Sequence, residues 1–424
     1  MQNFVTIFSE KTVEETKIAS SVSNIWIKCS GMTQVSKMEP VTVSYRSDER
    51  VWKVQMPDLK KVWDGALSES FLNCRNLSVV GLESLHTVHK YGMQRCFAGC
   101  VSLSNVTNSY TIPVYEVREN GFEYAFFNCY KLPELHFPYL SIIESGSFAY
   151  AFRKCADLKT ISFDTLETCG KSSFTSAFYQ CYGLNDVGFP ELKEVLADGF
   201  QNAFNSCTSL RLFVLPNIRV LKEDAFRSAF RNCDSIQYII LYNPDGEYEF
   251  SDYAFRNAFE PDSKVTFIVP EETYTEENDY PMFLQGCGLV DVPCLYRSPV
   301  QKTEYVKENL PETDSSGNVI DVDGNVLMDD ANKPITSTSI GQYSSKLFRL
   351  QKLRSQKTHT QAEQEEISIL TELESALSRV SYTEQTTQKV SYTYHVLKRL
   401  DETGFKDVYR LRDDTNELIQ IPIS

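Results

Sequence analysis

Four side chains near residue 90 are of the types that bind zinc. They are His86, His89, Cys96 and Cys100. A zinc site needs all four turned toward one point. Cys100, however, belongs to a series of cysteines that recurs along the chain, and Cys96 stands where the same series has alanine. We therefore interpret both thiols as core residues and predict no metal at this place.

A second group has the oxygen ligands that calcium prefers. Asp321, Asp323, Asn325 and Asp329 follow one another at short intervals, as in a calcium-binding loop. The terminal glutamate of an EF-hand loop is missing, and residues 316–326 equally fit a turn-rich β spacer. Calcium binding at these four residues is kept as an alternative to the spacer.

Residue patterns typical of enzymes do not stand out. Gly170-Lys171-Ser172 is similar to the end of a phosphate-binding loop, but Thr165 occupies the position of its first glycine. The chain has five histidines, and none stands in a recognisable Ser-His-Asp or Cys-His arrangement. We predict no catalytic residue and no cofactor.

The dominant feature of the chain is a repeat, F-x-x-A-F-x-x-C. Its five close copies begin at Phe122, Phe148, Phe174, Phe200 and Phe226. With two looser copies, the cysteines fall at positions 74, 100, 129, 155, 181, 207 and 233, so the spacings are 26, 29, 26, 26, 26 and 26 residues. A fixed period of this length indicates a solenoid, in which each unit buries its apolar face against its neighbours.

Each repeat predicts the same local elements. Val187 and Phe189 alternate with polar residues, which is typical of a strand with one buried face, and Pro190 ends that strand. The last three apolar positions of the unit, at i, i+3 and i+4, predict a short helical turn with its apolar side inward. In one clean copy these positions are Phe200, Ala203 and Phe204.

This unit resembles the BspA-type, or treponemal-type, leucine-rich repeat, whose core likewise reads A-F-x-x-C-x-x-L-x-x-I-x-L/F-P. The resemblance covers residues 51–270, and the units here are longer than the usual ones. It implies an α/β solenoid: a right-handed leucine-rich-repeat coil of about nine strands with short helical turns. A small N-terminal β cap and a C-terminal α+β module complete the predicted fold.

The predicted domains follow from where the repeat begins and ends. Residues 1–50 form an N-terminal β cap, residues 51–298 the solenoid with its C-terminal cap, and residues 299–340 a linker. Residues 341–424 form a helical segment followed by a β-hairpin module. A capping box at 360–363 opens its main helix, and residues 413–416 are expected to make a hairpin turn.

Composition excludes several partners. The net charge of −15 over 424 residues argues against nucleic acid, which needs a basic stripe, and against a polybasic membrane contact. No apolar run of 18 residues occurs, so we predict no membrane insertion. The N-terminus does not read as a signal peptide, which favours a cytoplasmic or virion-associated protein over a secreted one. The twelve cysteines are then expected to be free thiols.

The candidate binding residues are the outward-facing strand positions. In the middle coils they are polar, and in the last cysteine-bearing coils they turn apolar. A contiguous exposed apolar patch usually marks an interface. The patch either docks the chain's own C-terminal part or grips a partner or a second copy. The polar positions are Glu134, His136, Lys159, Asn185 and Asp186, and the apolar ones are Leu212, Val214, Tyr238 and Ile240.

The function predicted from these features is a non-enzymatic protein–protein interaction scaffold. BspA-type proteins are similar to adhesins and surface-recognition proteins, so the expected partner is a protein or a surface ligand, in a multi-protein assembly or a homo-oligomer. A structural or host-recognition component of a larger assembly, such as a phage virion appendage, fits best. The alternatives are a secreted or cell-surface adhesin and an enzyme with its active part in the C-terminal module.

Overall fold

A computed structural model places most of the chain, and its contacts divide the chain into two compact units. The first unit contains residues 1–298 and 395–424, and the second contains residues 299–394. The domain boundaries drawn from the sequence stay predictions. The structure describes residues 4–8, 25–36, 45–107, 109–243, 246–274, 281–329, 333–336, 350, 354, 361–380, 382–401 and 404–410.

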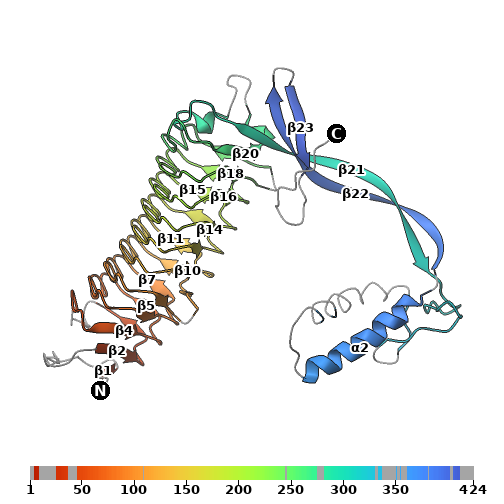
Figure 1. Ribbon diagram of the computed structural model, residues 1–424, viewed down its shortest axis with the longest axis horizontal. Coiled ribbons are helices and arrows are strands. Elements are labelled where there is room, and N and C mark those ends of the chain that lie inside the picture. The colour runs from red at the N-terminus through yellow and green to blue at the C-terminus, as the bar shows by residue number, and fades with distance from the viewer. Residues whose placement is uncertain are drawn as a thin grey trace. The chain divides into compact units, whose positions relative to one another are not determined.

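The first unit is a solenoid of about ten turns, where the sequence predicted a coil of about nine strands (Figure 1). Each turn adds a strand to a first series of parallel strands, and residue 160 pairs with 186 just as 212 pairs with 238. The first series contains β1 (Phe4–Phe8), β2 (Ile25–Ser30), β4 (Val51–Gln55), β6 (Val79–Gly81), β8 (Asn105–Val106), β10 (Glu134–His136), β12 (Thr160–Ser162), β14 (Asp186–Gly188), β16 (Leu212–Leu215), β18 (Tyr238–Leu241), β20 (Thr266–Pro270) and β21 (Cys294–Pro311).

A second series of short parallel strands lines another side of the solenoid. Its members lie between the strands of the first series in the chain and pair only with one another. They are β3 (Gln34–Val35), β5 (Lys61–Val62), β7 (Thr87–Val88), β9 (Glu116–Val117), β11 (Ile142–Ile143), β13 (Thr168–Cys169), β15 (Glu194–Val195), β17 (Val220–Leu221) and β19 (Glu249–Phe250).

Neither series is continuous. The hydrogen-bonded ladder of the first series stops between β8 and β10 and again between β14 and β16, whereas that of the second stops between β11 and β13. These statements hold for the described residues of the solenoid. Wherever one strand series lacks its ladder between two coils, the other series is hydrogen-bonded there. Every pair of neighbouring coils is therefore joined by at least one ladder.

The predicted short helical turns are not formed, and a chain of β-turns takes their place. In the coil of Phe200, the N–H of Ala203 donates to the carbonyl of Phe200 at 3.0 Å, whereas the N–H of Phe204 donates to Ala229 of the next coil at 2.9 Å. A helix would direct the Phe204 amide back to Phe200. Because alternate amides bind the neighbouring coil instead, the segment cannot wind into a helix. Asn202 adopts a φ of 53° between two of these turns.

The core consists of phenylalanine columns that run from coil to coil. Phe174 is fully buried and stacks on Phe148 and Phe200, with ring centroids 5.4 and 5.2 Å away. Phe178 belongs to a second column and lies 5.3 Å from Phe204. Offset stacking of this kind adds to the gain from burying the rings. The repeat thus specifies the fold through side chains that meet only when the coils are stacked.

The repeat cysteines form a third column, and all twelve cysteines of the chain are free thiols. The Sγ of Cys181 donates to the carbonyl of Phe152 in the preceding coil at 3.1 Å, and Cys207 does the same to Phe178. Burial raises the pKa of Cys155 to about 12. These thiols act as small buried side chains that bind a backbone carbonyl.

The sheet of the last coils is extended by a returning strand. β22 (Tyr382–Asp401) and β23 (Gly404–Arg410) form an antiparallel hairpin in the sheet that contains β16, β18, β20 and β21. Leu397 is fully buried against Ile268 and Leu295. Lys398 pairs with Glu271 at 2.8 Å, next to the short 3-10 helix η1 (Glu271–Thr273). A second one, η2 (Met282–Leu284), follows.

The second unit has a small core of its own. The helix α2 (Gln361–Ser378) buries Leu370 and Leu373 against Val319 and Ile335. Because α2 lies in the second unit and β23 in the first, the predicted C-terminal α+β module is not confirmed as one body. The hairpin turn expected at 413–416 lies outside the described residues. No helix among the described residues is long and apolar enough to cross a membrane.

Candidate partner-binding face

The candidate site is the outward face of the first strand series. Side chains alternate along each strand, so Leu135, Ile161 and Val187 point into the core while their neighbours point outward. Glu134 and His136 are half-buried on this face, and the ring of His136 lies 3.0 Å from the hydroxyl of Ser162 on the next strand. The predicted polar positions Lys159, Asn185 and Asp186 are exposed.

The predicted apolar positions divide into two groups. Tyr238 and Ile240 are half-buried, because they pack against the cluster of Ile268, Leu295 and Leu397. Their part of the patch is thus packed within the sheet, against side chains of β20, β21 and residue 397 of β22. Leu212, by contrast, is 44% exposed, and Val214 beside it is half-buried.

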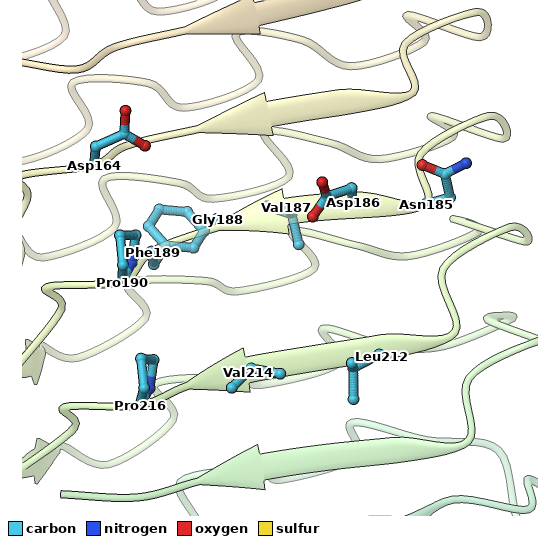
Figure 2. A pocket seen from close by; sticks show the side chains of 10 residues that line it. All are labelled: Asp164, Asn185, Asp186, Val187, Gly188, Phe189, Pro190, Leu212, Val214 and Pro216. Carbon is cyan, nitrogen blue, oxygen red and sulfur yellow. The ribbon is translucent and has the colours of Figure 1, made fainter. Parts of the chain in front are cut away.

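A pocket of about 360 Å³ opens beside Leu212, between β14 and β16 (Figure 2). We name it the β14–β16 pocket. Figure 2 shows Asp186 on β14 with Asn185 just before it, and Leu212 and Val214 on β16. The lining consists of Asp164, Asn185, Asp186, Val187, Gly188, Phe189, Pro190, Leu212, Val214 and Pro216.

The pocket lies where the ladder between β14 and β16 is interrupted. At the preceding junction, the N–H of Phe163 donates to the carbonyl of Gly188 at 2.9 Å. The equivalent N–H of Phe189 has no hydrogen-bond acceptor among the described residues, which include all of 185–216. Val187 is 7% exposed in a column whose other members are fully buried. The opening between the strands therefore reaches the edge of the core.

A change in the core pattern explains the interruption. In the coils of β12 and β14, the second inward position is phenylalanine, and Phe163 stacks on Phe189 at 5.0 Å. In the coil of β16 the ring moves to the first inward position, Phe213, and Leu215 takes the second. Phe213 packs on Phe204 instead, with centroids 5.1 Å apart. A large ring thus lies behind β16 where β14 has only valine.

The pocket offers binding groups and no catalytic set. Its polar side chains are Asp164, Asp186 and Asn185, and neither carboxylate has an ion-pair partner among the described residues. No histidine, cysteine, serine or lysine lines it. In the described part of the chain, no three histidine, cysteine or carboxylate side chains gather as a metal would require.

The zinc-type residues of the sequence are held apart by other contacts. The Sγ of Cys100 donates to the carbonyl of Phe71 at 3.2 Å, as the other repeat cysteines do in their coils. The ring of His89 stacks on Trp63 at 4.2 Å, and His86 meets the edge of Tyr115. The core-thiol interpretation accounts for these contacts.

The calcium-type residues form turns. The carboxylate of Asp321 accepts the backbone N–H of Asp323 and of Asn325 and pairs with Arg379 at 2.8 Å. The backbone N–H of Asn325 is the largest influence that holds the pKa of Asp321 below its ordinary value. Asp329 makes a similar turn with Lys333. Because Arg379 already neutralises Asp321, calcium binding is not proposed further.

Five lining residues of the pocket were missed by the sequence interpretation. Alternation identifies outward positions, so it selects Gly188 but not the two prolines, Asp164 or the core residues Val187 and Phe189. The signal that could have found the pocket is the change from V-x-F-P in 187–190 to F-x-L-P in 213–216. That shift interrupts the column of identical inward side chains, and regular pairing between neighbouring strands depends on such a column.

Comparison with known proteins identifies the repeat. The family model described as BspA type leucine rich repeat region (6 copies) matches residues 66–176, 93–229 and 122–260. No curated protein matches the chain.

Proposed function

Residues 66–260 belong to the BspA-type leucine-rich-repeat family, and we propose on this ground that the solenoid is a non-enzymatic scaffold that binds a protein partner. Stacked coils present a long regular surface, which suits recognition of an extended partner better than chemistry on a small substrate. The fold alone does not determine the activity, so the proposal also needs support from the site.

The observation that carries the proposal is the β14–β16 pocket with its exposed apolar neighbour. Leu212 is 44% exposed on a sheet face whose neighbouring apolar positions, Tyr238 and Ile240, already pack against the cluster of Ile268, Leu295 and Leu397. Exposed apolar surface beside a few polar groups is typical of interfaces. We assign the binding face to β12, β14 and β16, with Lys159, Asn185, Asp186, Leu212 and Val214 as its predicted contacts.

The setting we favour is a structural or host-recognition component of a larger assembly, such as a phage virion appendage. The second candidate is a cell-surface adhesin, which the family resemblance favours. Fractionation of the producing cells separates the two, because an adhesin is recovered with the cell surface and a virion component with particles. The third alternative, an enzyme centred on residues 341–424, concerns residues of which many lie outside those described.

The proposal is tested by photo-crosslinking in the native host. The photoreactive amino acid p-benzoyl-phenylalanine replaces Leu212 in one variant and Ile142 in a control. Ile142 is 50% exposed on β11, in the second strand series, so the two positions match in exposure and polarity. We expect a discrete crosslinked protein from position 212 alone. Equal yields from both positions, or none from position 212, would contradict the proposed face.

A further inference from the structure

We propose that the β14–β16 pocket binds an arginine or lysine side chain presented by an extended segment of the partner protein. This inference rests on the proposed function and names the chemistry of its contact. It follows from three properties of the pocket: its apolar wall, its two carboxylates and its interrupted ladder.

The apolar wall fits the aliphatic stem of a long basic side chain. Leu212 and Val214 form one side, and the rings of Pro190 and Pro216 close the end. Gly188 leaves the space in front of β14 open, because a Cβ built there meets only Ser162 of β12, at 3.3 Å, and nothing of β16. Arginine and lysine bury such stems along apolar surface while their charged ends reach polar groups.

The charge of the pocket is complementary to a cation. Asp164 and Asp186 both line it, and no ion pair involves either among the described residues. Some carboxylates elsewhere on the solenoid are paired with a cation of a neighbouring coil, as Glu144 is with Arg118 and Glu260 with Arg231. The nearby cations Lys159 and Arg211 do not line the pocket. The cation that these two carboxylates lack would therefore come from the partner.

The interrupted ladder favours a peptide over a small cation. The N–H of Phe189 is without an acceptor among the described residues, and β14 and β16 are not paired along their lengths. The side chain of Asn217 bridges the end of the gap by donating to the carbonyl of Pro190 at 2.7 Å. β14 and β16 still lie too close together to admit a further strand between them, and Phe189 is buried. A segment lying along this face can instead insert one basic side chain into the opening.

The experiment uses the full-length protein and two labelled peptides at low salt. One is acetyl-Val-Arg-Val-Thr-amide, and the other carries citrulline, which has the shape of arginine without its charge. Fluorescence anisotropy measures both affinities. We expect the arginine peptide to bind roughly tenfold more tightly, which is the size of one charge-assisted hydrogen bond. The preference should shrink as salt screens the carboxylates.

Variants assign the preference to the pocket. Asp186→Asn should remove the difference between the two peptides, whereas Asp262→Asn, at an exposed aspartate that does not line the pocket, should keep it. Circular dichroism confirms that both variants are folded. Equal affinity of the two peptides for the wild-type protein, no binding of either, or an unchanged preference in Asp186→Asn would overturn the inference. A partner crosslinked from position 212 would then still support the proposed function, so the two failures are distinguishable.

Discussion

The interruption between β14 and β16 predicts that one double substitution will close it. Phe213→Val with Leu215→Phe restores the pattern of the preceding coils, in which the ring occupies the second inward position. The new phenylalanine would continue the column in which Phe163 and Phe189 stack at 5.0 Å. We expect β14 and β16 to pair as β12 and β14 do, through three residue pairs.

The magnitudes follow from the contacts that change. The swap nearly conserves volume, which usually costs less than about 1.5 kcal/mol, and each ladder hydrogen bond returns about 0.5–1.5 kcal/mol. The present ring of Phe213 packs on four others, including Phe204 and Phe230 at 5.1 and 5.3 Å, and these contacts are lost. We therefore expect a small change in unfolding free energy. The clear effect should be at the amide of Phe189, whose hydrogen exchange should slow roughly fivefold for a bond of about 1 kcal/mol.

Hydrogen exchange resolved to single amides is the assay. In the wild-type protein, Phe189 should exchange faster than Phe163, whose N–H is bonded at 2.9 Å. The control is Ile239→Val with Leu241→Phe, the same kind of change one junction further on, where β16 and β18 are already paired. Equal exchange at Phe163 and Phe189 in the wild type, or an unchanged Phe189 in the double variant, would refute the proposed cause of the pocket.

Three further predictions concern other parts of the first unit. Leu397→Ala should destabilise the packing of β22 by about 2–5 kcal/mol, because Leu397 is fully buried. Limited proteolysis should then cut β22 faster in this variant than in the control Arg399→Ala, which changes an exposed neighbour. Equal cleavage rates in the two variants would contradict this. The repeat thiols should not react with Ellman's reagent at pH 8 until the protein is unfolded, because burial raises the pKa of Cys155 and Cys233 to about 12. Rapid labelling of the repeat cysteines in the folded protein would show that the cysteine column is accessible to solvent. Burial opposes ionisation of Glu271, but hydrogen bonds from Lys398 and Ser298 hold its pKa below the ordinary 4.5. This contact should therefore stabilise the fold above that pH, and the stabilisation should be lost as the pH falls through the lowered pKa. If a Glu271→Gln variant shows the same acid dependence of thermal stability as the wild type, this carboxylate is not the cause.

The solenoid could be predicted from the sequence because its core residues recur at a fixed interval. Phe174, Ala177 and Cys181 each repeat at a fixed interval, and all are fully buried. The second strand series was not described from the sequence because its two-residue strands, such as Glu194–Val195, are too short to show alternation. The helical turns were predicted wrongly because a chain of β-turns brings the same i, i+3 and i+4 side chains inward. Only the neighbouring coil, which accepts every second amide, distinguishes the two.

The candidate face was predicted in part. Alternation found Asp186 and Leu212, which line the pocket, and it also found Tyr238, which does not. Local sequence could not show that Leu397, more than 150 residues later in the chain, belongs to the cluster against which Tyr238 packs. The sequence does show that phenylalanine and leucine occupy positions 213 and 215, whereas the two preceding coils have isoleucine or valine and then phenylalanine at the equivalent positions. The effect of this change on the ladder, however, depends on the spacing of the adjacent strands.

The interruptions of the two strand series are staggered along the solenoid, and this has a mechanical consequence. The first series is interrupted after β8 and after β14, and the second after β11, so in the described residues no coil interface lacks both ladders. A pulling force along the axis would meet backbone hydrogen bonds at every interface, including the one that holds the pocket. The binding face can therefore contain an opening without becoming the interface at which the solenoid unfolds first under load.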